Sequence, residues 1–236
     1  MLAYISKGQG KALLFLHGYL SNKFSFNSQI EYFSRYYKVY APDLSGFGEN
    51  KPLDKAYKLD DYIADVLDFI KTVDIKDGFD IIAHSFGARI VLKSDELRKK
   101  ANKIVITGGA GLKTKKTLKY KIKVFFYKFL KKFFPKSKLI NKMGSEEYKT
   151  LSPVMKKSFT YIVNENLDYK LKDIENKVLL IYGDKDKTTP LYLAKRMKKG
   201  IKNSKLFVLK NAGHFAFVDK KIEFNSVARE FLLGEM

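Results

Sequence analysis

The sequence predicts an α/β fold, in which a mostly parallel sheet carries helices on both faces. Short apolar segments alternate with segments whose apolar residues recur every three or four positions. Glycine-containing loops separate them. Such alternation is typical of parallel sheets, in which ligands gather at the carboxyl ends of the strands. The expected strands cover residues 2–6, 12–16, 38–41, 79–83, 103–107, 178–182 and 205–209, and the expected helices cover 26–36, 59–73, 86–99, 191–199 and 222–233.

Two of these elements carry further local signals. Residues 2–6 and 12–16 are joined by Lys7-Gly8-Gln9-Gly10, and we expect them to pair as a hairpin. The helix at 59–73 has the three-and-four spacing of an amphipathic helix, with Asp60 or Asp61 placed to cap it.

The alternation is interrupted once. It stops at Gly108-Gly109-Ala110-Gly111 and resumes at residue 178, and the intervening stretch has weak strand character. The sequence therefore predicts one core domain formed by residues 1–110 and 177–236, with residues 111–176 as an insertion.

Composition limits the classes of protein that the chain can belong to. Of 236 residues, 45% are apolar, which is enough for a buried core and excludes a disordered or fibrous protein. No apolar run approaches the roughly 18 residues that span a bilayer, and residues 1–7 lack the features of a signal peptide. We expect a soluble, cytoplasmic protein. The absence of cysteine excludes disulfides, a thiol nucleophile and thiolate metal ligands.

The formal net charge is +21, from 41 Lys and 5 Arg against 25 acidic residues. Such an excess invites a nucleic-acid interpretation, because basic side chains neutralise phosphates. Base-edge and bidentate phosphate recognition favours Arg over Lys, however, and no nucleic-acid-binding motif occurs. We therefore expect no nucleic-acid partner.

A candidate nucleophile lies at the junction of the strand at 79–83 and the following helix. Ser85 stands between Ala83 and Gly87, as in a nucleophile elbow, where the residues two before and two after the serine must be small. Alanine replaces the usual first glycine. The alternative interpretation is that Ser85 only caps the helix.

A serine nucleophile needs a histidine base, and the chain has three histidines. His84 adjoins Ser85 and is expected to point away from the serine side chain, whereas His17 lies in the first loop. His214 follows the last expected strand at the same edge of the sheet, and is the candidate base.

The base needs a carboxylate that orients it. Gly183-Asp184-Lys185-Asp186 follows the strand at 178–182, and either aspartate fits by position. We favour Asp186, since Asp184 is suited to shaping the turn. The backbone N–H groups of Phe86 and of Tyr19, after Gly18, are the expected oxyanion donors.

Together these segments resemble the α/β-hydrolase superfamily. Five segments match in family order: Leu16-His17-Gly18-Tyr19, Asp43-Leu44-Ser45-Gly46-Phe47-Gly48, Ala83-His84-Ser85-Phe86-Gly87, Gly183-Asp184-Lys185-Asp186 and Gly213-His214. The resemblance implies the α/β-hydrolase fold, with Ser85, Asp186 and His214 as the catalytic triad. It also implies that residues 111–176 are a helical lid inserted after the sixth strand of the family's sheet, and that His17 and Asp43 shape loops around the site.

Within the expected lid, residues 113–142 contain 12 Lys and no acidic residue. Apolar residues recur there at steps of four, three, four and four, from Leu118 through Ile122, Phe125 and Phe129 to Phe133. The pattern predicts a helix with one aromatic face and one basic face. The apolar face packs on the core over the site, or the helix contacts an anionic lipid surface or steers an anionic substrate. The two interpretations are compatible.

The sequence thus predicts a serine hydrolase of carboxylic esters that needs no cofactor or metal and binds an apolar acyl group beneath the lid. The alternatives are a carbon–carbon bond hydrolase or thioesterase of the same fold and a non-catalytic, lysine-rich binding protein. Substrate identity and oligomeric state do not follow from the sequence.

Overall fold

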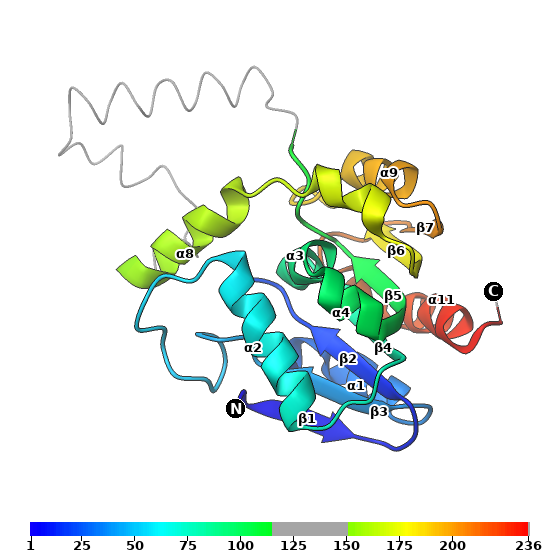
Figure 1. Ribbon diagram of the computed structural model, residues 1–236. Helices are drawn as coiled ribbons and strands as arrows, with labels where there is room; N and C mark the ends of the chain where they lie inside the picture. Colours follow the sequence, from blue (N-terminus) through cyan, green and yellow to red (C-terminus); the bar gives the residue numbers. More distant parts are fainter. Residues whose placement is uncertain (115–150, 236) are drawn as a thin grey trace.

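The computed structural model describes residues 1–114 and 151–235, which form a single mixed sheet flanked by helices (Figure 1). The strand order is β1-β3-β2-β4-β5-β6-β7. All neighbouring strands are parallel except β1 and β3. The strands are β1 (Tyr4–Lys7), β2 (Ala12–Leu16), β3 (Lys38–Pro42), β4 (Phe79–His84), β5 (Ala101–Thr107), β6 (Lys177–Gly183) and β7 (Ser204–Leu209).

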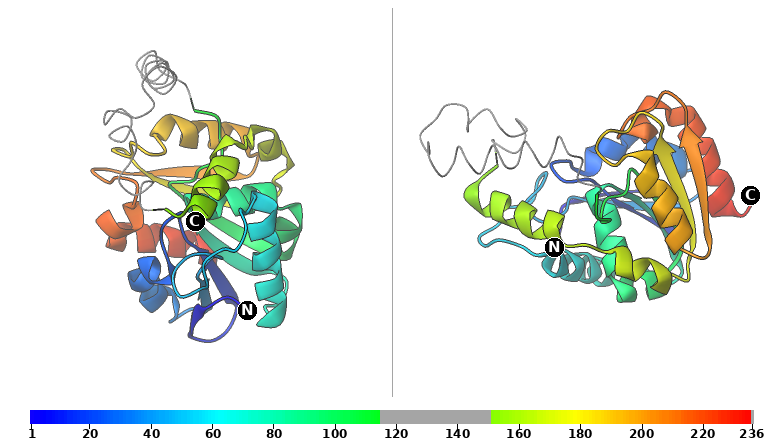
Figure 2. Two further views of the ribbon diagram at one scale, coloured as in Figure 1. Left: turned by 90° about the vertical axis from the view of Figure 1, so that its left-hand side faces the viewer. Right: turned by 90° about the horizontal axis from the view of Figure 1, so that it is seen from above.

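Helices cover both faces of the sheet (Figure 2). The segments α2, α3 and α9 pack on one face, and α1, α10 and α11 pack on the other. The helices are η1 (Lys23–Phe26), α1 (Asn27–Phe33), α2 (Leu59–Thr72), α3 (Phe86–Lys93), α4 (Asp95–Lys100), α8 (Pro153–Asn164), η2 (Asp168–Asp173), α9 (Leu191–Gly200), α10 (Ala216–Asp219) and α11 (Lys221–Leu233).

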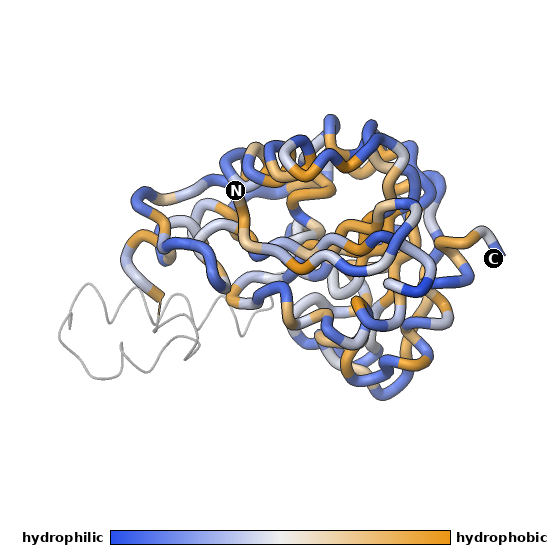
Figure 3. Tube along the Cα trace, turned by 90° about the horizontal axis from the view of Figure 1, so that it is seen from below, coloured by the Kyte–Doolittle hydropathy of each residue, from blue (hydrophilic) through white to orange (hydrophobic). Residues whose placement is uncertain are grey.

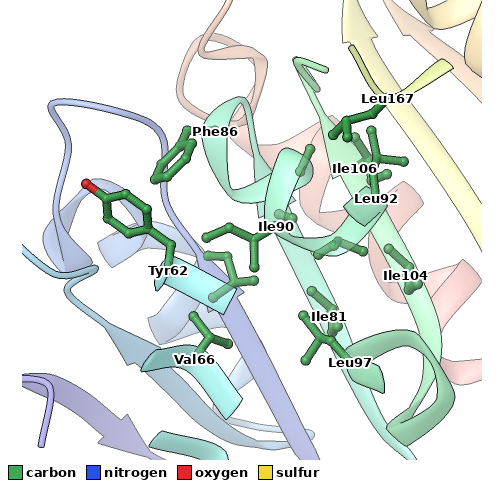
Figure 4. Close-up of a cluster of buried hydrophobic side chains, with 14 of the residues drawn as sticks. Tyr62, Val66, Ile81, Phe86, Ile90, Leu92, Leu97, Ile104, Ile106 and Leu167 are labelled. Carbon is green, nitrogen blue, oxygen red and sulfur yellow. The ribbon is translucent and has the colours of Figure 1, made fainter. Parts of the chain in front are cut away.

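Each central strand divides its side chains between two cores. In β4, Ile81 and Ala83 face the core beneath α2 and α3, whereas Ile82 faces the core beneath α1 and α11. Because both faces are buried, Ile81, Ile82 and Ala83 follow one another as a run of apolar residues, without the alternation of apolar and polar residues that a half-exposed strand shows. Figure 3 shows such apolar segments along the chain, and Figure 4 shows side chains of the first core, among them Tyr62, Ile81 and Ile106.

The expected hairpin between the first two strands is wrong. β1 pairs antiparallel with β3, with Tyr4 opposite Pro42 and Lys7 opposite Val39. The strand β2 is unavailable to it, because β3 and β4 occupy both of its edges. The first strand therefore extends the sheet at its outer edge.

The expected single helix at 86–99 is two helices, α3 and α4. Ser94 has extended backbone angles, with φ −83° and ψ 103°, which end the first helix. Its hydroxyl accepts a hydrogen bond from the Leu97 N–H at 3.1 Å and so caps the second helix.

Residues 151–176 return the chain from α8 to β6 and contact the loops at the carboxyl edge of the sheet. The Tyr19 hydroxyl donates to the Met155 carbonyl at 2.9 Å, and the Tyr57 N–H donates to the Ser158 hydroxyl at 2.8 Å. The segment α8 is thereby attached to the loops that follow β2 and β3. The residues 115–142, which carry most of the basic amphipathic pattern, lie outside the described residues. Within the described part of the chain, no helix is long and apolar enough to cross a membrane.

Candidate active site

The site is organised around a sharp turn at Ser85, between β4 and α3. Ser85 has φ 49° and ψ −102°, a backbone conformation that costs energy for any residue except glycine. Two main-chain hydrogen bonds of 3.1 Å hold the turn: the Ser85 N–H donates to Thr107, and the Ala110 N–H donates to the Ser85 carbonyl. The serine is therefore held at the carboxyl edge of the sheet.

The turn leaves no room for a side chain at Gly87. A Cβ atom there would lie 2.2 Å from the Leu16 carbonyl oxygen, which is main chain of the neighbouring strand. The Gly87 N–H donates to the His17 carbonyl at 3.1 Å. The small residue that the elbow pattern requires two positions after Ser85 is thus explained by the approach of α3 to β2.

His214 and Asp186 are joined by a hydrogen bond. The His214 Nδ1 atom lies 2.8 Å from Asp186 Oδ2. The same carboxylate accepts the N–H groups of Thr188 and Thr189 at 2.8 and 2.9 Å, and the Thr189 hydroxyl at 2.7 Å. Asp184 is exposed to solvent. Asp186, and not Asp184, is therefore the carboxylate beside the histidine.

Asp186 stays ionised although it is buried. Burial raises the pKa of its carboxyl, but hydrogen bonds from His214 and Thr189 outweigh burial and bring the pKa below the usual range. Thr189 was not predicted from the sequence. Its hydroxyl also lies 3.2 Å from His214 Nδ1, so it contacts both partners of the pair.

His84 packs against His214 and contacts its main chain. Its ring lies 4.7 Å from the His214 ring, and its Nε2 atom lies 3.1 Å from the His214 carbonyl oxygen. Burial and the neighbouring His214 lower the pKa of His84 to about 3, so the ring is neutral and donates this hydrogen bond. Within the described residues, no hydrogen bond joins the Ser85 hydroxyl to the His214 ring.

The loop that contains Tyr19, one expected oxyanion donor, is fixed by His17. Its Nε2 atom accepts from the Leu44 N–H at 2.9 Å, and its Nδ1 atom donates to the Gly18 carbonyl at 2.7 Å. Burial lowers the pKa of His17 to about 4, which keeps the ring neutral in this role. A Cβ atom on Gly18 would lie 2.9 Å from His84 Nδ1, so the loop approaches the elbow closely.

The Phe86 N–H, the other expected donor, opens α3. The first N–H groups of a helix have no acceptor within it, so this group is available to a ligand.

Asp43 joins the same loop to the loop after β3. Its carboxylate accepts the Lys23 N–H and the Lys23 ammonium, both at 2.7 Å, and the Glu49 N–H at 2.9 Å. Burial opposes ionisation, but these bonds hold the pKa of Asp43 below its usual range. Lys23, which is buried, was not predicted, since nothing in its local sequence separates it from the other 40 lysines.

A pocket of about 200 Å³ opens beside Ser85. Most of its wall is apolar, with Phe86 and Leu112 from the core and Phe159 and Ile162 from α8. Arg89 is the one charged side chain among the described residues that line it. No group of three His, Asp or Glu side chains that could hold a metal ion occurs within residues 1–114 and 151–235.

Comparison with known proteins identifies the family of the chain. The model of the "Alpha/beta hydrolase family" matches residues 13–226, and the chain belongs to this family. The AB hydrolase superfamily protein YisY of Bacillus subtilis is 25% identical over 248 residues, covering 95% of this chain and 92% of that protein.

Two solved structures show the same fold. The meta-cleavage product hydrolase CumD of Pseudomonas fluorescens has a TM-score of 0.76 and 20% identity, and the match covers 99% of this chain and 94% of that one. The esterase EaEST of Exiguobacterium antarcticum has a TM-score of 0.77 and 19% identity, with coverages of 98% and 94%.

The contact between Gly87 and Leu16 predicts that Gly87→Ala destabilises the protein. In most helices this substitution is stabilising, but here we expect a loss of about 2 to 3 kcal/mol, because the added methyl group meets main chain. Urea unfolding measures the change. Gly213→Ala is the control, since a Cβ there meets only the Asp219 carboxylate at 3.4 Å. Equal stability of the two variants would contradict this account of the turn.

The neutral histidines predict a loss of stability between pH 7 and pH 5. The pKa is about 4 for His17 and about 3 for His84 in the folded state, against about 6.5 when unfolded. As the pH falls, the unfolded chain therefore binds more protons than the folded chain does. Each histidine lowers the free energy of unfolding by about 2 kcal/mol by pH 5. Urea unfolding at pH 7, 6 and 5 tests this. We expect His17→Asn to remove about half of the pH dependence, and an unchanged dependence would contradict it.

Proposed function

We propose that the protein is a serine hydrolase of carboxylic esters. The observation that carries the proposal is the position of Ser85, on a strained turn beside an apolar pocket and at the same sheet edge as the His214–Asp186 pair. A serine hydroxyl reacts with carbonyl carbon when a base removes its proton, and the paired histidine is suited to that task.

In the proposed reaction, Ser85 attacks the ester carbonyl while His214 takes the hydroxyl proton. Asp186 holds the Nδ1 proton of His214, which leaves Nε2 as the base and stabilises the imidazolium that forms. The N–H groups of Tyr19 and Phe86 donate to the oxyanion. His214 then protonates the departing alcohol, and a water activated by the same histidine hydrolyses the acyl-enzyme. No residue in this scheme needs a cofactor or a metal.

We further propose that residues 111–176 act as a lid over the pocket. The support is that Phe159, Ile162 and Val163, from α8 and within this range, line the pocket beside Ser85. An apolar wall favours an apolar acyl group. A contact of residues 113–142 with an anionic membrane remains a separate proposal, and all but two of these residues lie outside the described ones.

Cleavage of a carbon–carbon bond is the second candidate. A relative from Metapseudomonas resinovorans, a 2-hydroxy-6-oxo-6-(2'-aminophenyl)hexa-2,4-dienoic acid hydrolase, is 22% identical over 97% of this chain and 86% of that protein. Comparing kcat/KM for nitrophenyl esters, acyl-thioesters and vinylogous diketones separates this activity, and thioester hydrolysis, from ester hydrolysis.

The proposal predicts different effects for two neighbouring aspartates. Asp186→Asn should lower kcat for 4-nitrophenyl butanoate by about 10³- to 10⁴-fold, because the histidine loses its orienting carboxylate. Asp184→Asn, with the same change of side chain at an exposed position, should stay within about threefold of the wild type.

Ser85→Ala should abolish both turnover and labelling by a fluorophosphonate. A wild-type protein that neither hydrolyses esters nor reacts with the fluorophosphonate, while Ser85→Ala keeps its cellular function, would identify a non-catalytic binding protein instead.

A further inference from the structure

Arg89 is a buried charge beside the pocket that the proposed mechanism does not use. Arg89 lies on α3, one helical turn after Ser85, and its side chain is only 8% exposed. It lines the pocket beside Ser85, among walls that are otherwise neutral in the described residues. A buried cation lowers the stability of the fold by several kcal/mol unless an anion or a set of hydrogen bonds replaces its hydration. The partners of Arg89 therefore show whether its charge is compensated.

The hydrogen bonds of Arg89 use only one side of the guanidinium. Its Nη1 atom donates to the Ile162 carbonyl at 2.7 Å and to the Glu165 carbonyl at 2.9 Å, at the carboxyl end of α8. A helix carboxyl end carries about half a negative charge, which compensates the cation in part. The opposite edge, formed by Nε and Nη2, has no hydrogen-bond partner within the described residues.

No carboxylate of the described residues forms an ion pair with Arg89. The acidic side chain that acts on it, Glu165, is paired with Lys93 at 2.6 Å. Burial lowers the pKa of Arg89 to about 10, and Glu165 opposes that shift, so the guanidinium is charged at neutral pH. Among the described residues, the cation therefore lacks a full counter-charge.

Arg89 also stands at the junction of two hollows. A second one, of about 490 Å³, shares Arg89, Leu112 and Val163 with the pocket beside Ser85. Its other charged lining residues are Lys113 and Glu165. A ligand that extends from Ser85 along the apolar wall can thus reach the guanidinium, and more room lies beyond it.

We propose that Arg89 is a specificity residue that binds a carboxylate of the substrate. The free Nε–Nη2 edge of a guanidinium matches the two oxygens of a carboxylate, and such paired hydrogen bonds are short and strong. The substrate class is an ester that carries a carboxylate on its acyl or alcohol part. This inference rests on the proposed ester hydrolysis by Ser85.

Two matched pairs of esters test the inference and locate the carboxylate. The first pair is 4-nitrophenyl hydrogen adipate and its terminal amide; the second is 4-carboxyphenyl butanoate and 4-carbamoylphenyl butanoate. We expect wild-type kcat/KM to be at least tenfold higher for the anionic member of one pair. Measurements in 0.5 M NaCl screen the attraction exerted by the net charge of +21.

Arg89→Gln should reduce this ratio to about one, because kcat/KM for the anionic ester falls at least tenfold more than kcat/KM for its neutral amide. Lys99→Gln, an exposed lysine on α4, makes the same change in charge and should leave the ratio intact. Ratios near one in the wild type, or a preference that survives Arg89→Gln, would overturn the inference and assign Arg89 to capping α8 alone.

A binding measurement covers the case in which Arg89→Gln detaches α8 and inactivates the protein. Calorimetry with folded Ser85→Ala should detect binding of adipate or 4-hydroxybenzoate, and no binding of adipamide or 4-hydroxybenzamide. Carboxylate binding without ester hydrolysis by the wild type would contradict the proposed function alone. Hydrolysis with neither carboxylate preference nor carboxylate binding would contradict the inference alone.

Discussion

The close approach of α3 to β2 is the constraint on which the site depends. With no side chain at Gly87, the helix starts directly after the strand, and Ser85 must take a positive φ to connect them. The strain at Ser85 is maintained by main-chain hydrogen bonds to Thr107, at the end of β5, and to Ala110. The position of Ser85, the Phe86 N–H at the helix start and the pocket wall all follow from this one turn.

Polar contacts of buried residues fix the loops around the turn. His17 connects the loop after β2 to Leu44, and Asp43, in the loop after β3, binds Lys23 from the segment after β2 and Glu49 from its own loop. His84 holds the main chain at His214. The pKa of each group is shifted so that the protonation state that makes these hydrogen bonds is favoured: the two histidines are neutral and Asp43 is ionised. The loops are thus prepared for a ligand before it binds, which lowers the reorganisation needed in the reaction.

The α/β class was predictable because strands buried on both faces and amphipathic helices leave clear patterns, as at Phe79–His84 and Leu59–Thr72. The pairing of β1 with β3 was not predictable, since the order of strands in a sheet depends on contacts between residues distant in sequence. Ser85 and His214 could be selected because local motifs mark them. Lys23 and Arg89 could not be selected, because their partners lie in segments distant along the chain. Thr189 could not be selected either, because it meets Asp186 in a turn that no sequence motif marks.

The central claim is that the turn at Ser85 presents a nucleophile to two main-chain donors. A crystal structure of the protein after reaction with a fluorophosphonate tests it most directly. The account predicts phosphorus bonded to Ser85 Oγ, with one phosphoryl oxygen about 2.7 to 3.1 Å from the main-chain nitrogens of both Tyr19 and Phe86. An adduct on another residue, or a phosphoryl oxygen directed away from both nitrogens, would contradict it.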